Sequence, residues 1–536
     1  MERRTRVRFA PSPTGPLHMG GMRTALYNYL FAKQRGGDFI LRIEDTDSNR
    51  FVPGAEQYII EALNWCGIVP DEGVDADGKV VETASAKHPH APYRQSQRRG
   101  IYRKYAEQLI ANGYAYYAFD SAAELEAVRS AAEAGGGTFT YNQKSRMTLR
   151  NSLTLSAEET ARLLEETTNW TIRFKMPEDT VVAMDDMIRG HIEVNTDTLD
   201  DKVLWKRADE LPTYHLANIV DDHLMEITEV IRGEEWLPSL PLHYMLYKAF
   251  GWEDTRPRFA HLSLLLKPVG NGKLSKRDGD KMGFPVFPLQ WIAADGTASH
   301  GYREDGYFPE AFVNMLAMLG WNPGDEREIF SMDELIQAFS MEKVQKAGAK
   351  FNPDKAKWFN REYLRMKDDG ELTDLFVPVL EANGIKVTGC PKCPVSHDFA
   401  AGSVSWNYVK GVVALIKERA TFVSDFWSIA PYLFKAPQED VEKDAAKFWK
   451  EDNYSLAIKA AEHMYAFEGP WTAEGIGEEL EGFIRGNEWP MGKVMNCLRL
   501  ALSGASSGLG IADILSFIGK EEFRSRMEKA ASVLGK

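Results

Sequence analysis

The sequence predicts an α/β protein built on a parallel sheet and followed by an all-helical C-terminal half. Two observations predict the sheet: a strand–helix–strand pattern over residues 7–43, and a return to alternating strands and helices over residues 211–266. From residue 309 onward apolar residues recur at helical spacing, and dense strand signals are lacking. The length of 536 residues indicates several domains.

The first strand–helix–strand unit is the best defined part of the chain. Its expected strands are Val7–Ala10 and Phe39–Ile43, and Gly36-Gly37 ends the helix between them. One apolar stripe of that helix faces the sheet, with the residues Met22, Ala25, Leu26 and Tyr29 at i, i+3, i+4 and i+7. Parallel sheets bind ligands at the carboxyl ends of their strands, and the second strand runs there into Glu44-Asp45-Thr46-Asp47.

The loop Pro11–Leu17 gives this unit its chemical character. Three prolines and Gly15 let a ligand approach the backbone, and His18 stands where the helix begins. Free N–H groups and the helix dipole favour phosphate at such a position. A tight turn alone would explain the glycine and prolines, but the number of special residues in one place favours a ligand site.

The following segments are read in chain order. We expect a helix from near Pro53 to Gly67, a surface loop over 71–91, and a helix from about 98 to 112. The basic residues of the last helix either face RNA or form a solvated charged face; they are Arg98, Arg99, Arg103 and Lys104. Residues 116–210 interrupt the sheet pattern and contain the strand-like segments WTIRFKM and HIEVNT.

The second half of the sheet pattern contains two segments with basic residues where a ligand could bind. A strand ends at Arg232-Gly233, again at a carboxyl end, and a last strand leads through Gly270-Asn271-Gly272 into a lysine-bearing loop that glycines make mobile. The connection over 282–305, rich in prolines and aromatics, is interpreted as a loop packed by its own side chains, without an assigned function.

Composition bounds the function classes. The net charge of −14 disfavours a nucleic-acid binder when taken alone, but local basic patches decide phosphate binding. The four cysteines give no disulfide framework and suit a reducing cytosol. Cys390 and Cys393 form a lone CxxC without a second pair, so we expect no structural zinc. Neither a signal peptide nor an apolar run long enough to span a membrane is expected.

Three motifs carry a resemblance to a known family. RFAPSPTGPLHMGG followed by RIEDTD resembles the N-terminal signature of bacterial glutamyl-tRNA synthetases, which are class I aminoacyl-tRNA synthetases. HMGG stands where the class carries HIGH; Gly21 replaces the last histidine, so only His18 is carried over. The class motif KMSKS is matched by KLSKR at Lys273–Arg277, and the family's middle signature by LPTYHLANIVDDHLMEITEVIRGEEW at Leu211–Trp236.

The resemblance implies a domain organisation. A Rossmann-like nucleotide-binding fold is expected over 1–115 and 211–305, interrupted by an inserted tRNA acceptor-binding α+β domain over 116–210. A helical stem-contact domain over 306–371 and an all-helical anticodon-binding region over 372–536 would follow. The insert is short for an additional hydrolytic editing domain, and a polar site can select glutamate without one.

The resemblance also implies the reaction. A glutamate–tRNA ligase activates L-glutamate with ATP and Mg²⁺ to glutamyl-adenylate and transfers it to the terminal adenosine of tRNA(Glu). Such chemistry needs positioning and cations more than a protein nucleophile, and no metal-ligating residues are assigned. We expect a cytosolic monomer that acts in protein synthesis, and members of the family commonly need tRNA present to activate glutamate. Whether tRNA(Gln) is also charged is left open.

The family motifs assign site residues. For ATP these are His18, Gly20, Trp236, Lys273, Ser275 and Lys276. The catalytic residues among them are Lys276, Lys273 and His18. Lys276 is expected to face the charge that develops in the transition state. For glutamate they are Arg8, Ala10, Ser12, Glu44, Tyr214, Asn218 and Arg232. Arginine suits the side-chain carboxylate because its planar fork is permanently charged, and Glu44 matches the partner of the amino group.

Residues for tRNA are assigned from the same resemblance. In the insert the basic residues Lys144, Arg146 and Arg150 are candidates for the acceptor end. VVALIKERATFVSDF, at 412–426, is expected to be a helix carrying Arg419, which matches an arginine that reads the third anticodon base in the family. The family associates that arginine with enzymes that refuse tRNA(Gln).

Three other functions fit the sequence less well. A truncated paralogue that glutamylates a modified tRNA base lacks the C-terminal half present here. A non-catalytic tRNA-binding or regulatory homologue is expected to have lost His18 or Lys276, and both are present. A glutaminyl-tRNA synthetase carries C-terminal β-barrels, which require strand signals that this segment lacks.

Overall fold

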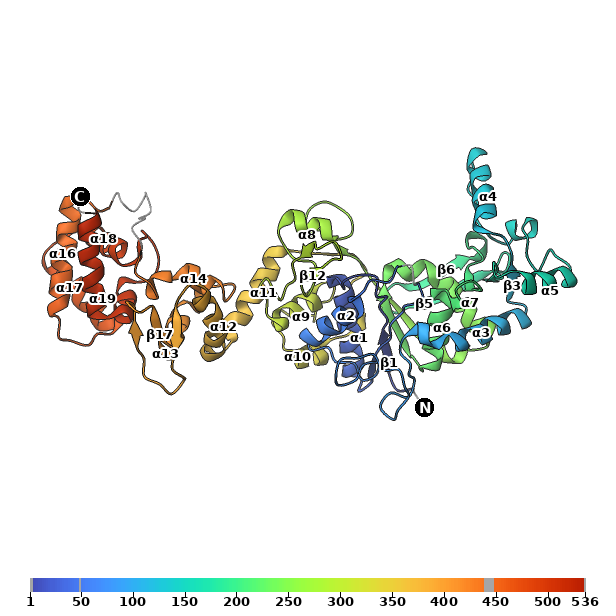
Figure 1. Cartoon of the computed structure of the whole chain (residues 1–536), viewed down its shortest axis with the longest axis horizontal. Coiled ribbons are helices and arrows are strands. Elements are labelled where there is room, and N and C mark those ends of the chain that lie inside the picture. The colour runs from blue at the N-terminus through green and yellow to red at the C-terminus, as the bar shows by residue number, and fades with distance from the viewer. Residues whose placement is uncertain (1–2, 48–49, 438–447, 535–536) are drawn as a thin grey trace. The chain divides into compact units, whose positions relative to one another are not determined.

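The chain forms two compact units, Met1–Phe359 and Asn360–Lys536, which we name the N-terminal and the C-terminal unit (Figure 1). The structure is a computed structural model and describes residues 3–47, 50–437 and 448–534. Each unit is described by itself.

A six-stranded sheet organises the N-terminal unit. Its order is β2 (Asp38–Leu41), β1 (Arg6–Phe9), β9 (Glu229–Gly233), β10 (Arg258–Leu262), β5 (Val181–Asp186) and β6 (Gly190–Asn195). Neighbouring strands are parallel from β2 to β5, and β6 is antiparallel to β5. The predicted parallel sheet is confirmed, and its carboxyl ends bring residues from distant parts of the sequence together.

Helix α1 (Met19–Gln34) packs on β1, β2 and β9 and also contacts α9 (Pro309–Met318) and α10 (Met332–Ala338). Of the predicted apolar stripe, Met22, Ala25 and Leu26 are fully buried, whereas Tyr29 is only partly buried. Tyr27, Asn28 and Phe31 are buried as well. The helix is therefore a core element surrounded by protein, and a single stripe understates its burial.

The segment 116–210 contributes to two sheets. Strands β5 and β6 extend the six-stranded sheet. An antiparallel sheet contains β3 (Ala115–Ala118), β4 (Thr171–Phe174), β7 (Val203–Lys206) and β8 (Leu211–Pro212). Helices α4 (Ala122–Ala134) and α5 (Ala157–Glu166) lie between β3 and β4 in the chain. Alternating polarity revealed the two strand-like segments of this region, but not that they pair in different sheets.

Three further helices pack on the two sheets: α3 (Arg99–Ala111) and α6 (Tyr214–Leu224) contact strands of the antiparallel sheet, and α7 (Leu240–Phe250) contacts β5. Arg98 precedes α3 and is buried in an ion pair with Asp221 of α6, with 2.8 Å between Arg98 Nε and Asp221 Oδ1. Neither reading of its charge, RNA contact or solvated face, applies to Arg98. Arg99, Arg103 and Lys104 are exposed, so the alternatives stand for these three.

The loop after KLSKR is packed, as expected. Helix α8 (Lys276–Met282) is followed by a small hairpin of β12 (Trp291–Ile292) and β13 (Ala298–Ser299). Phe287, Leu289 and Tyr302 are buried. The Tyr58 hydroxyl of α2 (Ala55–Trp65) donates to the Leu289 carbonyl oxygen at 2.6 Å, so the loop packs on α2 as well as on itself. Strands β11 (Leu265–Leu266) and β14 (Ala349–Lys350) pair, and α11 (Pro353–Met366) follows.

The C-terminal unit is mainly helical. Its longer helices are α12 (Asp369–Ala382), α13 (Trp406–Ile416), α16 (Glu451–Ala466), α17 (Ala473–Gly486), α18 (Met491–Ser503) and α19 (Ile511–Leu534). Around the break that the sequence shows near Cys390, three short strands form a small sheet: β15 (Lys386–Thr388), β16 (His397–Asp398) and β17 (Ser403–Ser405). Among the described helices, none is long and apolar enough to cross a membrane.

Candidate active site

A cavity of about 720 Å³ opens at the carboxyl ends of β1 and β9. The loop after β1, the residues after β2 and the start of α6 complete its wall. All seven residues that the resemblance assigns to glutamate line it: Arg8, Ala10, Ser12, Glu44, Tyr214, Asn218 and Arg232. Parallel strands bring these side chains together although more than two hundred residues separate the first from the last.

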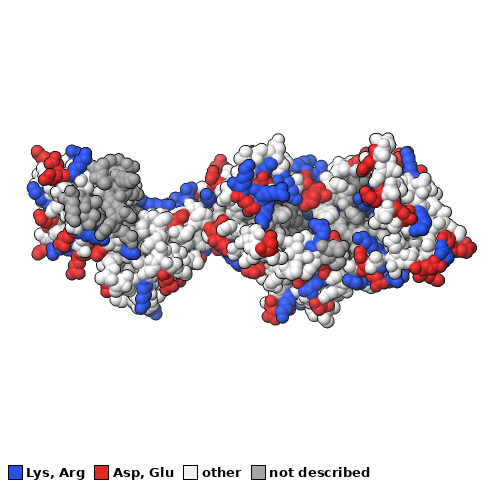
Figure 2. Space-filling view, turned by 45° about the horizontal axis from the view of Figure 1, so that its top comes forward, with Lys and Arg blue, Asp and Glu red and all other residues white. Residues whose placement is uncertain are grey.

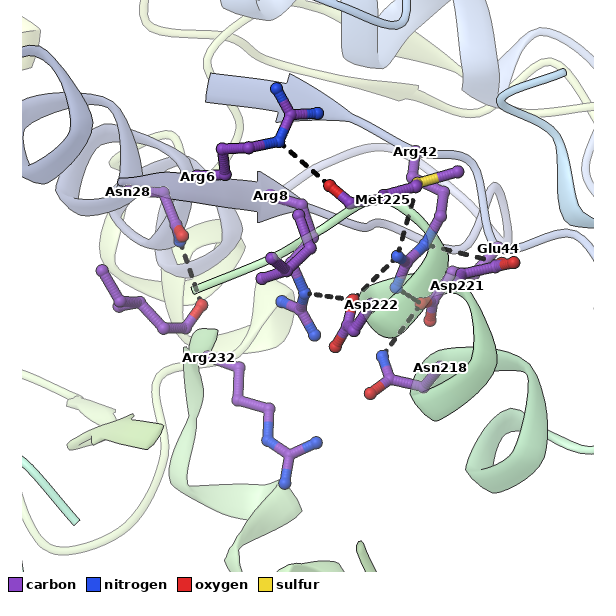
Figure 3. Close-up of polar contacts among 12 residues, drawn as sticks. Arg6, Arg8, Asn28, Arg42, Glu44, Asn218, Asp221, Asp222, Met225 and Arg232 are labelled. Atoms are coloured by element: carbon purple, nitrogen blue, oxygen red, sulfur yellow. Dashed lines mark hydrogen bonds and ion pairs between the residues drawn. The ribbon is translucent and has the colours of Figure 1, made fainter. Parts of the chain in front are cut away.

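A buried ion-pair network holds one side of the cavity (Figure 3). Asp222 Oδ1 accepts from Arg8 Nε at 2.9 Å and from Arg42 Nη1 at 2.8 Å. Glu44 Oε1 accepts from Arg42 Nη2 at 3.1 Å and from Asn218 Nδ2 at 3.2 Å. Arg42 is fully buried, and ion pairs with Glu44, Asp221 and Asp222 fix its plane. The network orients Arg8 and Glu44, whose side chains reach the cavity.

Arg232 lies on the other side of the cavity and has a different environment. Its guanidinium donates to the Tyr214 hydroxyl at 2.9 Å, to His261 Nε2 at 3.0 Å, to His243 Nδ1 at 3.2 Å and to the Trp236 carbonyl oxygen at 3.4 Å. All four acceptors are neutral groups. Arg232 is 5% exposed, and among the described residues no carboxylate forms an ion pair with it. A buried cation of this kind favours an anionic ligand.

Burial shifts the pKa values of the groups around the two arginines. Burial raises the pKa of Glu44, although Arg42 and Arg8 act in the opposite direction. Burial also raises the pKa of the Tyr214 hydroxyl. Glu44 offers a carboxylate to an ammonium group, while Arg8 and Arg232 offer cations to carboxylates. The arrangement therefore fits an amino acid with an acidic side chain.

His18 caps α1 with its own side chain. Its Nδ1 accepts from the backbone N–H of Gly20 at 3.0 Å and of Gly21 at 3.4 Å. Nε2 therefore carries the proton of the neutral ring and can donate to a ligand. The side chain is open to solvent, yet desolvation by the surrounding protein and the nearby Lys273 ammonium lower the pKa of His18. The N–H of Gly20 is occupied by this cap, and Gly21 rather than Gly20 lines the cavity.

The remaining residues assigned to ATP divide into two groups. Trp236 lines the cavity and stacks on Tyr214, with ring centroids 4.0 Å apart. Lys273, Ser275 and Lys276 lie outside the cavity lining, at the exposed start of α8. Lys and Arg side chains gather over this part of the unit (Figure 2); the exposed ones are Lys273, Lys276, Arg277 and Lys281.

The residues assigned to the acceptor end of tRNA differ in their exposure to solvent. Lys144 and Arg150 are exposed. Arg146 is buried: its Nη1 donates to the Met176 carbonyl oxygen at 2.9 Å and pairs with Asp201 Oδ2 at 3.2 Å. The expected RNA contact of Arg146 is therefore wrong, because its charge is neutralised inside the protein.

Arg419 is exposed, but it does not lie on a long helix. Helix α13 ends at Ile416, and Arg419 belongs to a 3₁₀ turn, Lys417–Arg419. The prediction of one helix over 412–426 is wrong in its second half. The single hydrogen bond described for its guanidinium is from Nη1 to the Gly508 carbonyl oxygen at 3.3 Å.

The CxxC pair lies in the turn between β15 and β16. Cys390 Sγ and Cys393 Sγ are 2.8 Å apart, and both thiols are free. Hydrogen bonds from the Cys393 thiol and the backbone lower the pKa of Cys390. Among the described residues, no cluster of three His, Cys, Asp or Glu side chains has the geometry to hold a metal. The expectation that the chain needs no structural zinc stays a prediction.

Sequence reasoning missed the residues that orient the site. Asp222, Arg42, His261, His243 and Asp186 were not assigned a role. Asp221 and Asp222 carried a signal: two adjacent acids on a helix whose other central residues are apolar are expected to have buried basic partners.

Three imidazoles beside Arg232 predict how stability depends on pH. Burial lowers the pKa of His243 and His261, and burial lowers that of His215 to about 4. In the unfolded chain each of these imidazoles has a pKa of ~6.5 and takes up a proton below that pH. The free energy of unfolding of the N-terminal unit therefore falls as pH falls below that value, by up to ~1.4 kcal/mol per pH unit for each imidazole. Urea midpoints measured between pH 7.5 and 5.5 check this.

A matched pair of variants isolates these histidines. His243→Gln removes one buried imidazole and is expected to flatten the dependence of the urea midpoint on pH. His300→Gln removes an imidazole whose side chain is 77% exposed and is expected to leave it unchanged. Equal pH dependence in the wild type and His243→Gln would contradict the assignment.

The chain was compared with known proteins. The family model "tRNA synthetases class I (E and Q), catalytic domain" matches residues 4–358, and "Anticodon binding domain" matches residues 371–531. A glutamate–tRNA ligase from Parabacteroides distasonis is 53% identical over 99% of both chains, and one from Porphyromonas gingivalis strain W83 is 53% identical over 100% of both. The crystal structure of a glutamate tRNA ligase from Elizabethkingia meningosepticum in complex with its amino acid superposes with a TM-score of 0.90 at 50% identity, covering 99% of this chain and 100% of that one.

Proposed function

From the premise that the chain belongs to the class I tRNA synthetases for glutamate and glutamine, we propose that it is a glutamate–tRNA ligase. It joins L-glutamate to ATP, giving glutamyl-adenylate and pyrophosphate, and passes the glutamyl group to the terminal adenosine of tRNA. The full-length relatives that share half of its residues carry this name. The observation in the molecule that supports this function best is the buried Arg232, whose partners among the described residues are neutral and which faces a cavity that also holds Arg8 and Glu44.

Each group of glutamate has a complementary group in the cavity. The side-chain carboxylate pairs with Arg232 and the hydroxyl of Tyr214, and the ammonium pairs with Glu44 beside Asn218. Arg8 meets a substrate oxygen with the guanidinium nitrogens that Asp222 does not take. Ser12 and the backbone at Ala10 add neutral hydrogen bonds. Direct ion pairs and hydrogen bonds to buried charges give the largest selectivity that a small polar site achieves.

ATP enters as its Mg²⁺ complex and lies along the loop that contains His18. Nε2 of His18 donates to a phosphate oxygen, and Trp236 packs against the nucleotide. Lys273 and Lys276 neutralise charge on the phosphates once the glycine-rich segment before them closes toward the cavity. The α-carboxylate of glutamate then attacks the α-phosphorus, and pyrophosphate leaves. Each of these contacts is part of the proposal.

The partners and setting follow from the same proposal. The exposed Lys144 and Arg150 contact the acceptor end of tRNA(Glu), and the C-terminal unit reads the anticodon. The chain acts as a monomer in this proposal. Four free cysteines support a reducing compartment, the cytosol.

Aminoacylation with purified components tests the proposed function. The enzyme, ATP, Mg²⁺ and tRNA(Glu) transcript are expected to yield acid-precipitable label from radioactive glutamate and background label from radioactive glutamine. Transfer of glutamine at a comparable rate, or of neither amino acid, would refute the proposal.

Replacement of Arg419 by glutamine tests the reading of the anticodon. Its guanidinium is exposed, and its described hydrogen bond, to the Gly508 carbonyl oxygen, is long at 3.3 Å. The guanidinium can therefore turn to pair with an unstacked base. We expect the wild type to charge tRNA(Glu) and refuse tRNA(Gln). In Arg419→Gln the preference for tRNA(Glu) over tRNA(Gln) is expected to fall ~10-fold or more, because one charged hydrogen bond is lost.

The control for this prediction is Arg485→Gln, which changes another exposed arginine of the C-terminal unit. It is expected to keep the wild-type preference. Wild-type charging of both tRNAs would refute discrimination, and an unchanged preference in Arg419→Gln would refute the role of Arg419.

A further inference from the structure

The three central residues of this inference lie on three neighbouring parallel strands. Arg232 is near the end of β9, His261 is its register partner on β10, and Asp186 ends β5, which lies beside β10. The side chains of His261 and Asp186 are 0% exposed, and neither residue belongs to the cavity lining.

The direction of every hydrogen bond in this row is fixed. An arginine only donates, so His261 Nε2, 3.0 Å from Arg232 Nε, is an unprotonated acceptor. His261 Nδ1 therefore carries the proton and donates it to Asp186 Oδ2 at 2.6 Å. Asp186 Oδ1 accepts from the backbone N–H of Ile188 at 2.9 Å and of Arg189 at 2.8 Å. The carboxylate thus fixes the tautomer of the imidazole, and the imidazole fixes the plane of the guanidinium.

The charges in this row are also defined. Burial opposes a charge on Asp186, but hydrogen bonds from His261 and the backbone of Arg189 outweigh it and lower the pKa of Asp186. Burial and the neighbouring Arg232 lower the pKa of His261, despite its bond to Asp186. The row is therefore a carboxylate, a neutral imidazole and a guanidinium. The carboxylate of Asp186 is linked to Arg232 through the His261 ring, in contrast to Arg8 and Arg42, which Asp222 contacts directly.

We propose that Asp186 and His261 are positioning residues that set the specificity of the site: they orient Arg232 through a neutral spacer and so leave its charge for the side-chain carboxylate of the substrate. A carboxylate in direct contact would orient Arg232 equally well but would neutralise part of its charge, and the preference for glutamate over glutamine would fall. The inference rests on the proposed function, because it assigns the selectivity of that site.

The alternative is that the pair only ties β10 to β5. A double variant separates the two roles. Asp186→Asn/His261→Glu keeps one carboxylate and the net charge of the row, but moves the carboxylate into contact with Arg232. His261→Gln keeps a neutral acceptor at Arg232 and serves as the matched control. The readouts are kcat/KM for glutamate and for glutamine in pyrophosphate release with tRNA(Glu), the KM for ATP, and the thermal unfolding temperature.

We expect the double variant to lose ~10- to 100-fold in kcat/KM for glutamate, the effect of one charged hydrogen bond, with a similar fall in the glutamate-to-glutamine ratio. His261→Gln is expected to keep the ratio within ~3-fold, and both are expected to keep the KM for ATP. A double variant with the wild-type ratio would overturn the proposal. So would a His261→Gln variant that loses as much as the double variant.

A second measurement applies if the double variant does not fold. Asp186→Asn lets the amide donate to His261 Nδ1 and turns the imidazole into the tautomer that cannot accept from Arg232. The KM for glutamate is then expected to rise ~10-fold or more with the KM for ATP unchanged. An unchanged KM for glutamate would overturn the proposal. Failure of the proposed function is distinct, because the wild type itself would then release no pyrophosphate with glutamate.

Discussion

Arg232→Ala is expected to lower kcat/KM for glutamate by ~10²-fold or more, while the KM for ATP stays near its wild-type value. The guanidinium is buried and its described partners are neutral, so the proposed function makes the side-chain carboxylate of the substrate its counter-charge. Alanine would leave that carboxylate buried without a charged partner. Steady-state kinetics of aminoacylation, with glutamate and ATP varied separately, measure the effect.

Arg232→Lys is the matched control for this loss. Lysine keeps the charge but loses the planar fork and its simultaneous bonds to Tyr214 and His261, so an intermediate kcat/KM is expected. Unchanged kinetics for glutamate in Arg232→Ala would show that the side-chain carboxylate is held elsewhere.

Lys276→Ala is expected to lower kcat for aminoacylation by ~10²-fold or more, as does the loss of one group that faces transition-state charge. The KM for glutamate should change little, because Lys276 lies outside the cavity lining. Single-turnover formation of glutamyl-tRNA separates this chemical effect from binding.

The control is Lys281→Ala, which removes an exposed lysine from the same short helix, α8. It is expected to retain near-wild-type kcat. Near-normal turnover in Lys276→Ala would rule out the assignment of Lys276, and equal losses in both variants would indicate a general effect of positive charge on α8.

The candidate site could be predicted in large part because parallel strands follow a simple rule. Arg8 and Arg232 each stand near the end of a strand, and neighbouring parallel strands end at the same edge of a sheet. The motif around His18 likewise predicted a ligand-binding loop, Pro11–Leu17, beside Arg8 and Arg232. Local pattern and strand direction place these residues at one edge of the sheet, whereas their assignment to glutamate comes from the resemblance to the family.

The orientation of single charged side chains could not be predicted in the same way. Arg98 and Arg146 looked like surface charges, yet each is buried against an aspartate distant in sequence. Asp186 was unmarked because its importance depends on β5 lying beside β10, and alternating polarity identifies a strand without naming its neighbour. The helix expected over 412–426 stops at Ile416 in the structure, and Arg419 lies in the 3₁₀ segment that follows.

The most direct test of the account compares glutamate and glutamine in ATP-dependent pyrophosphate release by the wild-type enzyme, with and without tRNA(Glu). We expect release with glutamate in the presence of tRNA(Glu). We expect a kcat/KM for glutamine that is lower by ~10⁴, because glutamine leaves Arg232 without a counter-charge. Equal use of the two amino acids would contradict the claim that the unpaired charge of Arg232 selects the substrate.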